Sequence, residues 1–332
     1  GALSGLLGRG GAHGGARHRG DGGGSATAAA GARGGPARAQ GGGAARGQGG
    51  ASAGAKKPQA EVSLRYTVSV LSGTGILGFE DNTANRARFA HPTSSLELPD
   101  GRLLITETHN NSLRLVTPEG HATTLVGHQG AGTRDGPIAQ ARFQRPRSLC
   151  LLPDGTIVVV DMDNRRVRTL SADLETVATI AGGQHHDRIH RDGMGGNANF
   201  GLPTAAAAGP DGSVIVVDKA THTLRQMVKR TDGRWEVTTI AGTPGVAGQR
   251  DGPCKGNADR MAQLNQPEGI TAASDGSFVF TEVGSHTVRR LAADLRSVTT
   301  FAGTSMLAGE ADGKHSSFNC PVAVAEVADG NF

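Results

Sequence analysis

Three histidines and an aspartate lie within residues 185–191 and form the most distinctive group of potential metal ligands in this sequence. Zinc takes imidazole and carboxylate ligands, but a structural site draws them from pairs at characteristic spacings. One loop segment does not offer that spacing, so we expect neither a metal site nor a cofactor. We interpret the segment as part of a polar contact surface that includes basic residues of two equivalent loops. This candidate partner-binding rim comprises Arg134, His185, His186, Arg188, His190, Arg191 and Arg250.

An acidic residue and an arginine recur seven positions apart in four successive segments. A ligand site is usually asymmetric, whereas a feature of every segment is expected to have one structural role. We interpret the acids as turn-forming residues and the arginines as their surface partners, because exposed ion pairs contribute only about 0–1 kcal/mol. The structural repeat positions are Glu107, Arg114, Asp161, Asn164, Arg168, Asp218, Arg225, Glu282 and Arg289.

These pairs belong to a long internal repeat. Each copy starts at a proline, has Asp-Gly eight and nine residues later, and places the arginine 22 residues after the proline. Several anchors in one register are the signature of a repeat architecture. The prolines are Pro92, Pro146, Pro203, Pro267 and Pro321, and the fifth copy ends before its arginine position.

Each copy predicts four short strands, which in the second copy are 147–152, 156–161, 166–171 and 176–181. Asp-Gly between two apolar runs is a strong hairpin signal because both residues tolerate positive φ. One four-stranded antiparallel sheet cannot bury both of its faces, whereas several sheets packed around an axis can. The sequence therefore predicts an all-β propeller whose first strands line the axis.

The second copy, from Asp161 to Arg168, resembles the NHL repeat, whose signature joins an acidic residue, Asn-His, an apolar residue and Arg or Gln. The other copies have Asn110-Asn111, Thr221-His222 and Ser285-His286 at the Asn-His positions. The resemblance covers about residues 68–332 and implies a β-propeller with four complete blades here and six in the intact protein. In similar algal proteins a BTB domain often follows, which implies substrate recognition for a ubiquitin ligase.

Both ends of the sequence favour a fragment. The chain starts with glycine, and it stops where a second strand is expected to begin. We expect residues 68–73 to form the fourth strand of an incomplete copy and residues 322–327 to form a first strand. Such a fragment would leave apolar faces uncovered at its two terminal blades.

The chain divides into a tail, residues 1–60, and the repeat region, residues 61–332. They carry eight Lys or Arg and one acid, a net charge of +7, whereas the remainder carries 26 basic and 29 acidic residues, a net charge of −3. Glycine and alanine dominate this tail, which has too little apolar area to offset the entropy of folding. We expect a disordered linker that binds nucleic acid weakly and in a salt-sensitive manner.

The chain lacks an apolar run of the ~20 residues needed to span a membrane, so we expect no membrane partner. Its three cysteines, Cys150, Cys254 and Cys320, share no repeat position, so no disulfide framework is expected. This usage is typical of a reducing compartment, and we expect an intracellular, cytoplasmic location.

Ionisable side chains near the expected first strands are Glu97, Arg147, Glu268 and Glu326, which we interpret as solvated channel ends or strand edges. These strands contain no His or Asp, and no catalytic triad or carboxylate pair stands out. We therefore predict no catalytic residues and no enzymatic activity. The predicted function is a non-enzymatic scaffold whose loops on one face bind a protein partner. The alternatives are an RNA-binding propeller and a metal-dependent propeller lyase or hydrolase.

Overall fold

The computed structural model describes residues 69–127, 130–183, 189–257, 259–312, 316–327 and 330–332, all within the unit Tyr66–Phe332. Apart from one 3-10 turn, η1 (Gly195–Asn197), the regular elements of these residues are strands. The predicted all-β class is confirmed. The predicted tail, residues 1–60, lies outside the described residues, so its disorder stays a prediction.

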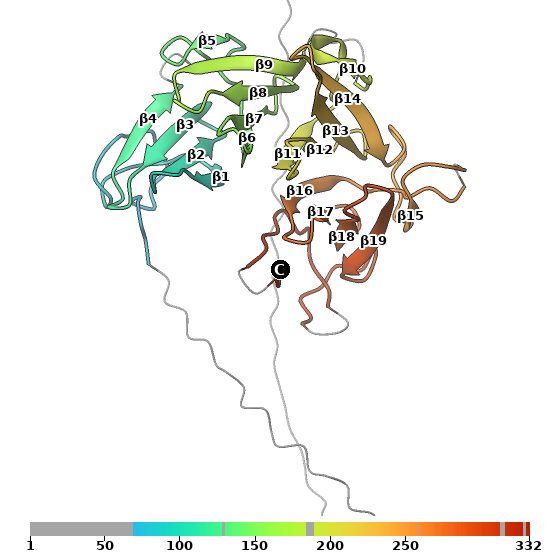
Figure 1. Ribbon diagram of the computed structural model, residues 1–332. Coiled ribbons are helices and arrows are strands. Elements are labelled where there is room, and N and C mark those ends of the chain that lie inside the picture. The colour runs from blue at the N-terminus through green and yellow to red at the C-terminus, as the bar shows by residue number, and fades with distance from the viewer. Residues whose placement is uncertain (1–68, 128–129, 184–188, 258, 313–315, 328–329) are drawn as a thin grey trace, which may run out of the picture. The chain divides into compact units, whose positions relative to one another are not determined.

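Four antiparallel sheets form successive propeller blades around the inner strands β1, β6, β11 and β16 (Figure 1). In the order of the sheets, the strands are β1 Pro92–Glu97, β2 Leu103–Glu107, β3 Ser112–Val116 and β4 Ala122–Val126 in blade 1; β6 Pro146–Leu151, β7 Ile157–Asp161, β8 Arg166–Leu170, β9 Thr176–Gly182 and β5 Gly136–Pro137 in blade 2; β11 Pro203–Ala208, β12 Val214–Asp218, β13 Thr223–Lys229, β14 Trp235–Ala241 and β10 Gly193–Met194 in blade 3; β16 Pro267–Ala272, β17 Phe278–Glu282, β18 Thr287–Leu291, β19 Ser297–Ala302 and β15 Gly252–Pro253 in blade 4.

The four strands predicted for blade 2 are confirmed to within one residue at each end. The apolar runs and the Asp-Gly turn between them located these strands. In the first of these turns the Asp154 carboxylate accepts a hydrogen bond from the Thr156 backbone N–H at 3.0 Å, and Gly155 has φ of 83°. A positive φ at this position carries little steric cost for glycine.

The long connections between blades take part in the sheets. Each connection adds a short outermost strand to the blade that follows it, so β5, β10 and β15 pair with β9, β14 and β19. In blade 1 the equivalent pairing is reduced to the single bridge Asn82–Ala122. The connections therefore run along the outer edge of the blades before they return to the axis.

On the return path, each connection inserts one apolar side chain between neighbouring blades. Phe143 is fully buried among Leu113 of blade 1 and Leu170 of blade 2. Phe200 and Leu264 fill the two following interfaces in the same way. One apolar residue of each connection thus fills the interface between two blades.

The repeated arginines were expected on the surface, and this expectation is wrong. Arg168 is fully buried and its guanidinium bonds Asp161 at 3.1 Å, Asp135 and the backbone carbonyls of Arg134 and Arg142. Its cationic carbon lies 4.4 Å from the centre of the Phe143 ring. The arginine therefore joins the middle of its blade to the connection wrapped around it. Arg114, Arg225 and Arg289 make equivalent bonds.

The acid of each pair has the turn-forming role predicted for it. Asp161 accepts hydrogen bonds from the backbone N–H of Gln144 at 2.8 Å and from the Asn164 amide at 2.7 Å. Burial raises the pKa of Asp161 to about 6, although these bonds and Arg168 favour its ionised form. The Asn164 amide also donates to the carbonyl of Gly132, which explains why asparagine suits this position.

At the two ends the predicted strands are absent from the described residues. Residues 69–73 and 321–327 have no assigned strand pairing. The second segment nevertheless lies beside β16, where the Glu326 carboxylate accepts hydrogen bonds from the Ser274 N–H at 2.7 Å and its hydroxyl at 2.8 Å. Gly269 allows this approach, since a Cβ there would overlap the Val322 carbonyl.

Candidate functional site

A central cavity of about 550 Å³ lies between the inner strands β1, β6, β11 and β16 and the segment 322–325. Hydroxyl side chains join successive inner strands around it. Thr93 donates to the Arg147 carbonyl at 3.0 Å, and Thr204 donates to the Glu268 carbonyl at 2.7 Å. Such bonds satisfy backbone groups at the free edge of each inner strand, which would otherwise be costly to bury.

A buried carboxylate in this cavity is held by two cations from different blades. Glu268 on β16 is only 3 % exposed, and it pairs with Arg147 of β6 and with Lys219 at 2.7 Å. Lys219 directly follows β12, so the cluster joins blades 2, 3 and 4. The expectation that Glu268 is a solvated channel end is therefore wrong. The strand-edge interpretation holds for Glu97, which is exposed.

The sequence carried a signal for this cluster that we did not use. Arg147 and Glu268 each follow the first-strand proline directly, at a position where blades 1 and 3 have threonine. Equivalent positions face the axis in every blade, so opposite charges there can meet across the cavity. Lys219 was missed because it lies in a turn that the repeat pattern marks as variable.

The candidate rim residues do not gather in one place. Arg134, Arg191 and Arg250 are exposed and lie one to a blade, each directly before the aspartate that binds the buried arginine of that blade. We call these three the perimeter arginines. His190 is half-buried, and its Nε2 lies 3.1 Å from the Thr239 hydroxyl. His185, His186 and Arg188 lie outside the described residues.

The turns between the second and third strands connect neighbouring blades through a side-chain acceptor. Nδ1 of His222 accepts a hydrogen bond from the backbone N–H of Gln266, the residue before the next proline, at 2.9 Å. Asn111 and His286 make the equivalent bond to the next blade at 2.9 and 3.1 Å. We call this bond the blade latch, and it explains why His or Asn suits the second residue of the Asn-His pair.

Blade 2 departs from this pattern because Arg165, which has no acceptor, occupies the latch position. The residue before the next proline, Leu202, instead donates its N–H to Oδ1 of Asp218 at 2.9 Å. The other oxygen of Asp218 accepts the N–H of Gly201, also at 2.9 Å. Asp218 ends β12, so both bonds lie within blade 3, and the Leu202 N–H is satisfied there rather than by a latch from blade 2.

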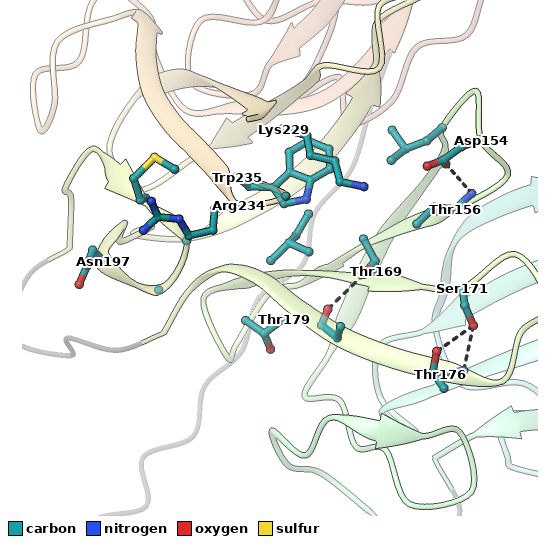
Figure 2. A pocket seen from close by; sticks show the side chains of 17 residues that line it. Asp154, Thr156, Thr169, Ser171, Thr176, Thr179, Asn197, Lys229, Arg234 and Trp235 are labelled. Atoms are coloured by element: carbon teal, nitrogen blue, oxygen red, sulfur yellow. Dashed lines mark hydrogen bonds between the residues drawn. The ribbon is translucent and has the colours of Figure 1, made fainter. Parts of the chain in front are cut away.

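A second cavity, a groove of about 630 Å³, lies between blades 2 and 3 (Figure 2). Hydroxyls of blade 2 face Lys229, Arg234 and Trp235 of the blade 3 hairpin. The polar groups are mostly satisfied locally: the Ser171 hydroxyl donates to Asp173, and Arg234 pairs with Asp232 at 2.7 Å. The groove therefore shows less unused binding capacity than the central cavity.

Within the described residues there is no cluster of three or more His, Cys, Asp or Glu side chains placed to hold a metal ion. The three cysteines are free, with Cys150 and Cys254 buried and Cys320 exposed. Burial raises the pKa of the Cys150 thiol to about 12, which disfavours the reactive thiolate. In the same part of the chain, no helix is long and apolar enough to cross a membrane.

No protein-family profile matches the chain, but curated proteins with NHL repeats do. The protein SUPPRESSOR OF QUENCHING 1, chloroplastic, of Arabidopsis thaliana is 23 % identical over 260 residues, which cover 74 % of this chain and 24 % of that protein. NHL repeat-containing protein 2 of Gallus gallus is 28 % identical over 81 residues, 24 % of this chain and 11 % of that protein. The chain thus spans a quarter or less of the length of these relatives.

Solved structures share the fold at low identity. An auxiliary nutrient binding protein from Bacteroides ovatus aligns with a TM-score of 0.52 and 16 % identity over 72 % of this chain and 54 % of that one. A gluconolactonase from Xanthomonas campestris aligns with a TM-score of 0.48 and 16 % identity over 73 % of this chain and 67 % of that one. A streptogramin B lyase aligns with a TM-score of 0.46 and 15 % identity over 72 % and 60 %.

These likenesses contradict one prediction. The chain was predicted not to be an enzyme, yet propellers of similar fold include a lyase and a gluconolactonase. The fold is therefore no ground for excluding catalysis, and that exclusion is withdrawn.

Proposed function

We propose, from the resemblance of this chain to NHL-repeat propeller proteins, that it binds an acidic segment of a protein partner through its perimeter arginines. The observation that carries the proposal is that Arg134, Arg191 and Arg250 are exposed at equivalent positions of three successive blades. Blade 1 has Glu80 at this position, so the basic surface is limited to blades 2, 3 and 4.

The backbone beneath the perimeter arginines is fixed from inside each blade. The carbonyl oxygens of Arg134, Arg191 and Arg250 accept hydrogen bonds from the buried arginines at 2.6, 2.8 and 3.1 Å. Their positions are thus set before a partner arrives, which lowers the entropic cost of binding. A run of carboxylates on an extended partner segment complements three such positions.

The test measures binding of a short fluorescein-labelled peptide rich in Glu and Asp to the full chain, by fluorescence anisotropy at low ionic strength. Replacing all three perimeter arginines with glutamine is expected to weaken binding about tenfold, because each exposed ion pair contributes roughly 0.2–1 kcal/mol. The difference should shrink as salt is added, because salt screens exposed charges.

The matched control replaces three arginines away from the perimeter, which lie in the turns β1–β2, β13–β14 and β18–β19: Arg102, Arg234 and Arg296. It removes the same charge and is expected to change the affinity by less than about twofold. The basic tail is present in both variants, so the difference between them reports on the propeller. Equal loss in the two variants would show that binding depends on net charge alone and would reject the proposal.

A further inference from the structure

Two serine hydroxyls that line the central cavity are free to donate a hydrogen bond to a ligand. The Ser94 hydroxyl accepts the Leu149 N–H at 3.2 Å, and the Ser148 hydroxyl accepts the Ala206 N–H at 3.2 Å. Each hydroxyl is thereby fixed as an acceptor of a backbone donor, and its own O–H remains to donate. Within the residues described, neither hydroxyl donates a hydrogen bond to a protein acceptor.

The guanidinium of Arg147, which lines the cavity, also has N–H donors that bond no oxygen acceptor in the surrounding strands. Arg147 carries five N–H donors, of which one nitrogen pairs with Glu268 and another contacts only the Met162 sulfur, at 3.9 Å. Lys219 pairs with the other oxygen of Glu268. Two cations thus share one carboxylate, and the cluster keeps a formal charge of +1 in a cavity from which bulk water is partly excluded.

Excess positive charge beside unused donors suits an oxyanion. We propose that the central cavity binds a small organic anion, a carboxylate or a phosphate, which Arg147 contacts directly and the hydroxyls of Ser94 and Ser148 complete. Lys219 is a positioning residue, because it neutralises Glu268 and leaves Arg147 free to pair with the ligand. The volume of about 550 Å³ suits a small metabolite. This site is separate from the perimeter arginines and does not depend on the function proposed for them.

The test titrates the full chain with glutarate in one arm and inorganic phosphate in the other, by isothermal titration calorimetry at low ionic strength. Arg147→Gln is expected to weaken binding of the preferred anion about tenfold or more, since it removes a charge-assisted bond. Glu268→Gln is expected to tighten binding about tenfold, because it removes the competing carboxylate and raises the charge of the cluster to +2. A gain of affinity cannot result from misfolding, so this variant covers the case in which Arg147→Gln fails to fold.

The control is Arg165→Gln, which removes a cation from the turn between β7 and β8 and does not line the cavity. It is expected to change the affinity less than about twofold. Tighter binding of glutarate identifies a carboxylate ligand, and tighter binding of phosphate identifies a phosphate ligand. The proposal is overturned if neither anion binds, if Arg147→Gln binds as wild type does, or if Glu268→Gln weakens binding.

Discussion

Two kinds of arginine pair with carboxylates inside this molecule, and their surroundings differ: Arg168 is fully buried, whereas Arg147 is about a quarter exposed. Arg168 and its three equivalents lie in the middle of each blade, and each bonds two carboxylates and two backbone carbonyls. Arg147 occurs once, beside the axis, and shares a single carboxylate with Lys219. In the first kind both terminal nitrogens of the guanidinium bond the blade and its connection, whereas one terminal nitrogen of Arg147 contacts only the Met162 sulfur.

This difference separates charges that build the fold from charges that are available to a ligand. An arginine that recurs in every blade, and bonds carboxylates and carbonyls there, holds the connection against that blade. A group that breaks the repeat, as Arg147 and Glu268 do, is not required by the blade architecture, since threonine occupies the position in blades 1 and 3. The following variants test whether the two kinds respond differently.

The largest effect is expected from Arg168→Met. Removing this cation leaves Asp161 and Asp135 without their partner and two backbone carbonyls without a donor. Breaking a buried ion pair from one side costs about 3–5 kcal/mol. Urea denaturation followed by circular dichroism would give the change in the free energy of unfolding.

The matched control is Arg102→Met, which removes an exposed ion pair with Asp100 and is expected to change the free energy of unfolding by less than about 1 kcal/mol. Similar losses in both would mean that the buried network contributes little.

An intermediate effect is expected from Glu268→Gln in the absence of any ligand. The substitution keeps the shape of the side chain but leaves Arg147 and Lys219 without their counter-charge. We expect a loss of about 1–3 kcal/mol, less than for Arg168→Met, because both cations are about a quarter exposed and water can solvate them. The same denaturation measurement checks it. A loss as large as that of Arg168→Met would place the cluster of Arg147, Lys219 and Glu268 among the networks that hold the fold together.

The propeller could be predicted because its determinants are local and repeated. Proline, Asp-Gly and the alternating apolar residues each specify one turn or one strand, and four copies in one register reinforce one another. The outermost strands β5, β10 and β15 were missed because they have only two residues each and contain glycine, so neither alternation nor propensity marks them. Their positions depend on the tertiary bonds of Asp135 and its equivalents.

Burial of the repeated arginines could not be predicted from their charge alone. Arg168 is buried because the connection that wraps its blade supplies two carbonyls, from Arg134 and Arg142, more than 20 residues upstream. The pairing of Arg147 with Glu268 likewise joins residues of blades 2 and 4. Contacts between residues so far apart in the sequence depend on how the sheets and connections pack around the axis. The sequence of a single repeat does not specify that packing.

A smaller effect, dependent on pH, is expected at the blade latch of His222. Burial lowers the pKa of His222, partly opposed by the nearby Asp218 carboxylate, and Nδ1 must be unprotonated to accept the Gln266 N–H. The unfolded chain binds this proton below about pH 6.5. The latch therefore stabilises fully above that pH, and its contribution is lost as the pH falls through the lowered folded value.

Comparing wild type with His222→Asn tests this, because Asn111 makes the same latch in blade 1 without titrating. Denaturation curves between pH 5 and 8 should show that wild type loses more stability than the variant as the pH falls. Identical pH profiles would show that His222 is not a titrating group of the interface.

The smallest effect is expected from Arg165→Asn, which places the latch residue of blade 1 into blade 2. If the latch were an independent stabilising unit, a new acceptor would strengthen the interface of blades 2 and 3 by about 1 kcal/mol. The structure predicts otherwise, because Leu202, the only possible donor at this position of the repeat, already donates its N–H to Asp218 at 2.9 Å. The new amide would compete for an N–H that already has an acceptor, so we expect a change within about 0.5 kcal/mol.

The double variant Arg165→Asn with Asp218→Asn sharpens the test, because Asp218→Asn weakens the existing acceptor. Arg165→Asn should then recover part of the loss measured for Asp218→Asn alone. Recovery would show that an amide of blade 2 can accept the Leu202 N–H once the carboxylate of blade 3 no longer competes for it, whereas its absence would show that residue 165 is not placed to form a latch.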